Sequence, residues 1–291
     1  MQIVYHIGAE CTDGDRLLKS LLKNSDPLSQ QGIKVPGPGR YRRLLEETIQ
    51  NLDGRAPAPE TRDILIDAIL DEDSASRLVL SFQNFICGPN RIFEDGIFYG
   101  RAAYKLSALR GLFPQDELEL CLSVRNPATW LPAVYEKSYY KDLGAFLCGL
   151  HPEDLRWSEV IALIQDTLPG VPLTVWCMED TPLIWAQLIR EISGVDPLTK
   201  ISGGFDLLNA IMAPEGMKRF LTYLKTHPPQ TEVQKRRIIQ AFLERYALED
   251  EVEEEVDLPG WDAAMIDHLT ELYDEDMLEV ARMPGVTFIA P

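Results

Sequence analysis

Residues 3–24 read IVYHIGAECTDGDRLLKSLLKN, a short apolar strand, a turn with two glycines and then an amphipathic helix. A turn between a buried parallel strand and a helix directs free backbone N–H groups, and the positive end of the helix dipole, at whatever lies above the strand. The stretch therefore has the frame of a phosphate-binding loop. Instead of the usual lysine or arginine, the turn offers Cys11, Thr12, Asp13 and Asp15. The two carboxylates would repel a phosphate at contact distance.

Strand-like and helical runs then alternate along the chain. Strands are expected at residues 2–8, 77–82, 118–124 and 172–178. Each run is almost continuously apolar, which is typical of strands covered on both faces and hence of a parallel sheet. Helices are expected at about 14–24, 39–52, 60–72, 100–112, 127–140, 156–168 and 181–193. The crossovers are long enough for right-handed βαβ units, so the pattern predicts an α/β fold with a central parallel sheet.

Beyond Gly194 the pattern becomes helical. GFDLLNAIMAPEGMKRFLTYLKTH and EVQKRRIIQAFLERYAL are amphipathic, WDAAMIDHLTELYDEDMLEVARM predicts a further helix, and VTFIAP predicts a short final strand. We expect one domain over residues 1–291, with an α/β core at 1–195 and a helical extension at 196–291. The extension should pack on the core, because the acidic run within it leaves too little apolar surface for a separate one.

Composition and charge limit the function classes. Hydrophobic residues make up 45% of the 291 residues, no apolar run approaches the ~20 residues of a membrane helix, and no signal-peptide n-region precedes the first strand. The five widely spaced cysteines fit reduced thiols of a cytoplasmic protein, and no metal-ligand pattern is present. A net charge of −18 argues against nucleic acid and anionic membranes as partners. The oligomeric state is not indicated.

The charge is unevenly distributed along the chain. The acidic run EDEVEEEVD at 249–257 is expected to form a solvated linker or loop, while arginines gather at 40–43 and basic residues at 235–237. Surface charges are screened beyond roughly 8–10 Å at physiological salt. A locally positive cleft that binds a small anionic molecule is therefore compatible with the acidic total.

Four segments, in order, resemble sulfotransferases that use 3′-phosphoadenosine 5′-phosphosulfate. They are the opening HIG, turn and helix followed by Gly32-Ile33 and Pro36; LVLSFQNF at 78–85; LSVRNPATWLPAVYEKSYY at 122–140, similar to that family's R-x-P-x-x-W segment; and VWCMEDTPLIWAQLIREISG at 175–194. The tail MPGVTFIAP is similar to bacterial members of the family. The resemblance implies a P-loop-like three-layer sandwich and sulfonate transfer to a hydroxyl acceptor. It implies a donor site at Gly8, Cys11, Thr12, Gly14, Arg16 and Arg125.

Departures from the family pattern fall on the chemistry. The position of the family's loop lysine falls on Cys11, its following Gly-Thr-Thr falls on Asp13, Gly14 and Asp15, and a serine of the 3′-phosphate segment is replaced by Ala133. Loss of one preorganised donor typically costs ~2.7–4 kcal/mol of transition-state stabilisation. Because Asp13 and Asp15 would repel the phosphates by more than the helix dipole attracts them, we expect weak or no binding of 3′-phosphoadenosine 5′-phosphate.

Several candidate residues have two interpretations. His6 is either a catalytic base or a hydrogen-bonded core imidazole, and Gln83, which cannot take a proton, orients a ligand or satisfies loop backbone. Arg125 binds a phosphate or pairs with a carboxylate. Cys11 is a thiolate, or a neutral thiol whose pKa is raised by Asp13 and Asp15. Glu179 and Asp180 are expected to cap the helix that begins near Thr181.

Two function classes remain open. The first is a sulfotransferase in which Arg16 or an arginine of the 40–43 segment replaces the missing lysine in space. The second is a non-catalytic family member that binds a small ligand or a protein partner. A nucleotide-sugar glycosyltransferase is a third interpretation, but Asp13 and Asp15 lie in the wrong kind of turn for a metal-binding Asp-x-Asp motif.

Overall fold

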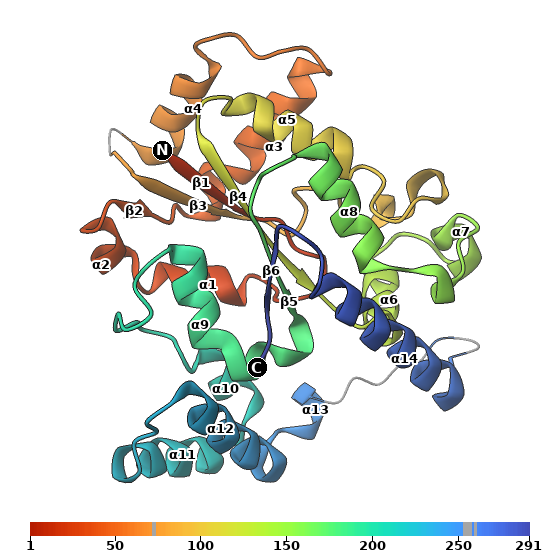
Figure 1. Ribbon diagram of the computed structural model, residues 1–291. Helices are drawn as coiled ribbons and strands as arrows, with labels where there is room; N and C mark the ends of the chain where they lie inside the picture. The colour runs from red at the N-terminus through yellow and green to blue at the C-terminus, as the bar shows by residue number, and fades with distance from the viewer. Residues whose placement is uncertain (72–73, 253–257, 259–260) are drawn as a thin grey trace.

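The computed structural model describes residues 1–71, 74–252, 258 and 261–291. Six strands form one all-parallel sheet in the order β2-β3-β1-β4-β5-β6 (Figure 1). The strands are β1 (Gln2–His6), β2 (Ile33–Lys34), β3 (Arg77–Ser81), β4 (Glu117–Val124), β5 (Leu173–Cys177) and β6 (Val286–Ile289). The predicted α/β class and the parallel pairing of the four predicted strands are confirmed.

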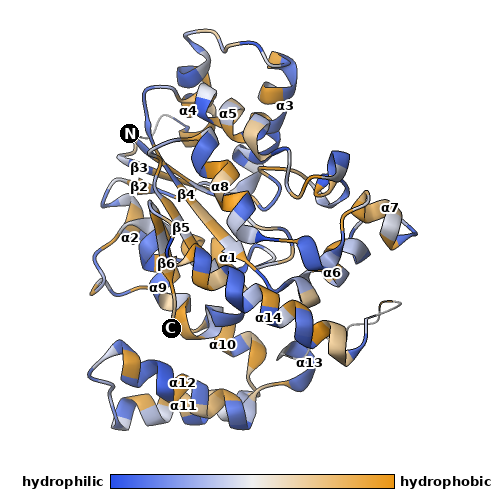
Figure 2. Cartoon of the chain, turned by 45° about the vertical axis from the view of Figure 1, so that its right-hand side comes forward, coloured by the Kyte–Doolittle hydropathy of each residue, from blue (hydrophilic) through white to orange (hydrophobic). Residues whose placement is uncertain are grey.

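The sheet is covered by helices on both faces because side chains along a strand alternate between them. Ile3 and Tyr5 of β1 face one apolar cluster, and Val4 faces the other. Figure 2 shows the hydrophobic strands at the centre, surrounded by helices with mixed faces. This arrangement explains why the strands have continuously apolar sequences.

Six longer helices pack in the first cluster: α3 (Arg42–Leu52), α4 (Thr61–Leu70), α5 (Ala102–Leu112), α6 (Pro127–Glu136), α8 (Trp157–Thr167) and α14 (Ala263–Val280). The second cluster contains α1 (Arg16–Leu22), α9 (Thr181–Ser193), α10 (Asp206–Ile211), α11 (Pro214–Thr226) and α12 (Glu232–Tyr246). Three short helices complete the described chain: α2 (Ser25–Ser29), α7 (Leu143–Leu147) and α13 (Glu249–Val252). No helix in the described ranges is both long enough and apolar enough to cross a membrane.

Differences from the expected elements have local causes. The long helix expected at GFDLLNAIMAPEGMKRFLTYLKTH is divided into α10 and α11, because Pro214 lacks a backbone N–H and restricts Ala213 to the extended conformation found there. Strand β2 has only two residues, too few for a periodic signal. Part of the acidic run forms α13, and its residues 253–257 lie outside the described part of the chain.

The last third of the chain returns to the sheet. Strand β6 pairs in parallel with β5, and α14 packs against α6 and α8. The carboxylate of Asp276, in α14, accepts hydrogen bonds from the backbone N–H of Trp157 at 2.6 Å and of Ser158, and from the Ser158 hydroxyl. Asp276 is thus a buried cap for the first turn of α8, supplied by a helix more than a hundred residues away in sequence.

We expect Asp276→Ala to lower the free energy of unfolding by about 1–3 kcal/mol, because it leaves buried N–H donors of α8 without an acceptor. Glu275→Ala, an exposed change on the same helix, should have little effect. Denaturant unfolding measures both. Equal losses for the two variants would show that Asp276 does not cap α8.

Candidate functional site

The loop after β1 lies at the carboxyl edge of the sheet, where parallel α/β proteins bind ligands. It continues the pairing with β4: the N–H of Ala9 donates to the carbonyl of Ser123 at 2.7 Å, and the N–H of Ser123 donates to Gly8 at 2.6 Å. Gly8 has a φ of 110°, and a Cβ there would approach the carbonyl of Gln83 to 2.9 Å. Glycine is therefore required where the loops after β1 and β3 meet.

The carboxylate of Asp13 uses the amides that a phosphate would need. Its Oδ1 accepts a hydrogen bond from the backbone N–H of Asp15 at 3.3 Å, and its Oδ2 accepts one from Leu17 at 3.1 Å. The side-chain amide of Gln83 donates to Oδ1 at 2.6 Å. The N–H of Arg16 is taken by the backbone carbonyl of Asp13 at 3.0 Å. With a phosphate-loop backbone, the N–H groups from Thr12 to Arg16 would point into an open hollow that could hold an anion. The N–H groups of Asp15 and Arg16, however, already donate to Asp13.

A second acid of the loop binds an arginine. Arg42 contacts Asp15 with both terminal nitrogens, at 2.9 and 2.6 Å, and also donates to the carbonyl of Ser81. The hydrogen bond from Arg42 lowers the pKa of the Asp15 carboxyl despite partial burial. This bidentate pair joins the start of α1 to α3 and to the end of β3.

The other arginines proposed as substitutes for the lysine have acidic partners away from the loop amides. Arg16 lies 3.8 Å from Glu251, Arg40 lies 3.3 Å from Asp71, and Arg43 lies 2.7 Å from Glu47.

Lys137, directly after α6, brings an ammonium to Cys11, the position that aligns with the loop lysine of the sulfotransferases. Its ammonium lies 2.9 Å from the carboxylate of Glu10 and within hydrogen-bonding reach of the Cys11 thiol. Burial raises the pKa of the Cys11 thiol, and Lys137 only partly offsets this. The thiol is therefore favoured over the thiolate, but the cause is burial rather than Asp13 and Asp15. One signal in the sequence pointed to Lys137: it lies in the segment 122–140, which resembles the sulfotransferases.

Arg125 holds the loop to α6 through backbone oxygens. Its guanidinium donates to the carbonyl of Cys11 at 2.7 Å and to the carbonyl of Thr129 at 3.0 Å. Arg125 is only 4% exposed, and this burial lowers the pKa of its guanidinium. In this arrangement Arg125 positions the loop.

His6 and Thr12 are both buried. The Nδ1 of His6 lies 2.9 Å from the hydroxyl of Ser81, its ring stacks on Trp176, and burial lowers its pKa, so the imidazole is neutral. With 1% exposure, His6 is out of reach of solvent or a ligand. The hydroxyl of Thr12 donates to the carbonyl of Ala9 at 2.7 Å and so braces the turn from within.

The prediction that Glu179 and Asp180 cap α9 is wrong. Asp180, the residue immediately before α9, makes no side-chain capping hydrogen bond. Burial, together with Glu179, raises the pKa of Asp180 to about 6. Glu179 instead accepts hydrogen bonds from the backbone N–H of Asn126 at 2.7 Å and from the Tyr273 hydroxyl at 3.1 Å. It therefore connects the start of α6 with α14.

A cavity of about 490 Å³, here called the β3 cavity, opens beside the end of β3. Its walls come from α3, from α5 and from the loop after β3, with Tyr139 at one side. The size suits a small organic molecule. Residues that line it are Glu46, Ile49, Gln50, Phe82, Asn84, Cys87, Gly88, Asn90, Arg91, Arg101, Tyr104, Lys105 and Tyr139.

Three cations line this cavity, and Asn84 is among its polar lining residues. Arg101 lies 2.7 Å from Glu94, which is 3.9 Å from Arg91, whereas Lys105 has no ion pair within 4 Å among the described residues. Burial lowers the pKa of the Lys105 ammonium, and Arg101 adds to the shift although Glu46 opposes it. The buried Oδ1 of Asn84 accepts no hydrogen bond from the described residues. The cavity could not be predicted from local sequence patterns, because its residues come from four separate segments.

Asp13→Ala tests whether this carboxylate fills an anion site. We expect a loss of about 1–2 kcal/mol in unfolding free energy in an anion-free buffer, because the amides of Asp15 and Leu17 lose their acceptor. Added sulfate should restore part of that loss by binding the freed amides, which thermal denaturation measures.

Sulfate stabilises many proteins by exclusion, so the relevant quantity is the excess over the wild type. Asp26→Ala, which removes an exposed aspartate from the first turn of α2, is the matched control. The same sulfate dependence in all three proteins would mean that Asp13 fills no anion site.

Comparison of the sequence with models of known protein families finds no match, and comparison with curated protein sequences finds none either.

Proposed function

We propose that the chain is a non-catalytic, sulfotransferase-like protein that binds a small organic anion in the β3 cavity. The non-catalytic part of this proposal rests on the Asp13 carboxylate, which accepts hydrogen bonds from the Asp15 and Leu17 amides and from Gln83. A phosphate at the same amides would first have to displace it. The P-loop-like form of the fold, with β1, a tight turn and α1 in succession, belongs to the same proposal.

Displacement of Asp13 would not remove its charge from the site. Two unit charges about 4 Å apart repel by about 4 kcal/mol at an effective dielectric near 20. The dipole of α1 contributes only ~0.3–1 kcal/mol in return. Arg42 cannot neutralise Asp13, because it is already paired with Asp15. The loop therefore disfavours the donor nucleotide.

The β3 cavity has the opposite electrostatic character. Arg91, Arg101 and Lys105 line it against a single lining carboxylate, that of Glu46. An anion there would compensate the partly buried Lys105 ammonium. Asn84 adds a polar amide to the lining, so the proposed ligand carries a hydroxyl or N–H group as well as an anionic group.

One observation favours sulfonate transfer as a second candidate. Lys137 reaches Cys11, the position aligned with the family's lysine. For transfer, this ammonium would have to leave Glu10 and approach the donor's bridging oxygen. The buried, neutral His6 supplies no accessible base for the acceptor hydroxyl.

Isothermal calorimetry with small aromatic probes and with the bisphosphate nucleotide distinguishes the candidates. We expect 4-hydroxybenzoate, which has an anion and a hydroxyl donor, to bind more tightly than benzoate or 4-hydroxybenzyl alcohol, each of which lacks one of the groups. Lys105→Met should weaken binding about tenfold, the equivalent of roughly 1.4 kcal/mol. Lys141→Met, an exposed change outside the cavity, is the control.

The wild type should give no binding heat with 3′-phosphoadenosine 5′-phosphate. Micromolar binding of this nucleotide that is lost in Lys137→Ala would overturn the non-catalytic proposal in favour of transfer. Equal effects of Lys105→Met and Lys141→Met on 4-hydroxybenzoate would refute the cavity as the anion site.

A further inference from the structure

Helices α11 and α12 form a hairpin at the far end of the molecule from α3 and α4 (Figure 1). Residues 214–246 contain seven lysines and arginines against three acidic residues, a net charge of +4, whereas the whole chain has −18. The hairpin is therefore a basic element on a strongly acidic protein. Neither the loop after β1 nor the β3 cavity uses it.

The hairpin is held rigidly on its inner side. Phe220 of α11 and Ile239 of α12 are buried in the second apolar cluster. Gly216 lies so close to Tyr246 that an added Cβ would approach the Tyr246 Cβ to 2.3 Å. The N–H of Ala213 also donates to the carbonyl of Tyr246 at 2.8 Å. The relative position of the two helices is thus fixed by packing.

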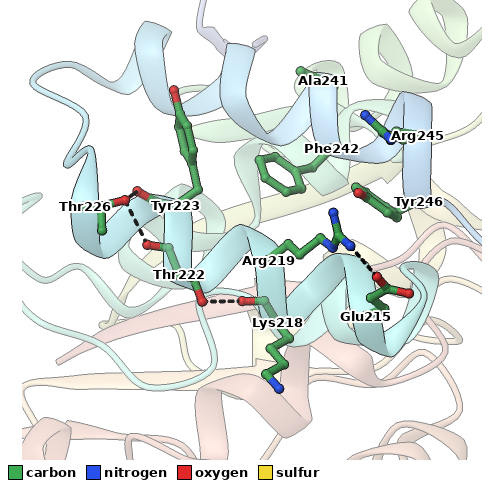
Figure 3. Close-up of a pocket in the computed structure, with 10 residues that line it drawn as sticks. All are labelled: Glu215, Lys218, Arg219, Thr222, Tyr223, Thr226, Ala241, Phe242, Arg245 and Tyr246. Atoms are coloured by element: carbon green, nitrogen blue, oxygen red, sulfur yellow. Dashed lines mark hydrogen bonds and ion pairs between the residues drawn. The ribbon is translucent and has the colours of Figure 1, made fainter.

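The outer side of the hairpin is a groove of about 730 Å³, here called the hairpin groove. Its lining residues are Glu215, Lys218, Arg219, Thr222, Tyr223, Thr226, Ala241, Phe242, Arg245 and Tyr246 (Figure 3). Phe242 lies with its ring 5.9 Å from that of Tyr223 and 5.9 Å from that of Tyr246. Tyr223 is 40% exposed, which leaves an aromatic surface open to solvent.

Arginines surround this aromatic surface. The guanidinium of Arg245 lies 5.6 Å from the ring centre of Tyr246, and that of Arg219 lies 6.0 Å from it. Arg219 is paired at 2.6 Å with the exposed Glu215, which an incoming carboxylate could replace. Tyrosine and arginine are among the residue types most enriched at the energetic centres of protein interfaces.

We propose that the hairpin groove binds a short acidic segment of another protein, one that presents aromatic or aliphatic side chains between its carboxylates. Carboxylates would pair with Arg219, Arg245 and Lys218, and the apolar side chains would cover Phe242 and Tyr223. Because three cations and one carboxylate line the groove, charge complementarity favours an acidic partner. A long nucleic acid is disfavoured because the rest of the chain, at −22, would repel it.

Fluorescence anisotropy with a labelled peptide of sequence EEFDLEFD tests the proposal on the full chain. We expect saturable binding that is lost when the acidic residues of the peptide are replaced by lysine and weakened when its Phe and Leu residues are replaced by alanine. Arg245→Glu and Phe242→Ala should each weaken binding about tenfold or more. Circular dichroism establishes that both variants remain folded.

Lys225→Glu is the matched control, because it reverses a charge on α11 outside the lining of the groove. Its effect should stay below about threefold, as expected for a charge outside the contact. Equal weakening by Arg245→Glu and Lys225→Glu would overturn the proposal in favour of diffuse attraction. Tighter binding of a single-stranded oligonucleotide, or a wild-type dimer that Arg245→Glu dissociates, would overturn it in favour of nucleic acid or a second copy.

Discussion

Hydrogen bonds from the amides of Asp15 and Leu17 to the Asp13 carboxylate determine the form of the loop after β1. Gln83 brings the end of β3 to the same carboxylate, and Arg42 ties Asp15 to α3. Asp13 therefore caps the first turn of α1, and its carboxylate offsets the positive end of the helix dipole without an external ligand. A loop of this kind needs no external anion to be stable. Its backbone form therefore does not by itself imply the chemistry that similar loops perform.

Charge is distributed unevenly over the molecule. The total charge of −18 opposes binding of a polyanion over a broad surface, yet the β3 cavity and the α11–α12 hairpin are locally positive. Screening over roughly 8–10 Å lets such regions act independently of the acidic remainder. The proposed small anion fits the cavity because Arg101 and Lys105 are partly buried. The proposed peptide fits the hairpin groove because its arginines and aromatic rings lie on an open surface.

Local patterns in the sequence predicted the sheet well, because strands covered on both faces must be apolar throughout. They failed at β2, which is too short, and at α10 and α11, where Pro214 ends one helix and begins the next. The succession of β1, turn and α1 was predicted, as was the absence of a lysine from the turn. The partners of its side chains were not predictable, since Arg42, Gln83 and Lys137 come from distant segments that only the fold brings to the loop.

The central claim is that Asp13 already occupies the amides that would otherwise bind an anion. A crystal structure of the wild type grown from ammonium sulfate tests it most directly. The account predicts the Asp13 carboxylate within hydrogen-bonding distance of the Asp15 and Leu17 amides, with no sulfate on them. A sulfate bound to those amides, with the Asp13 side chain turned out toward solvent, would contradict it.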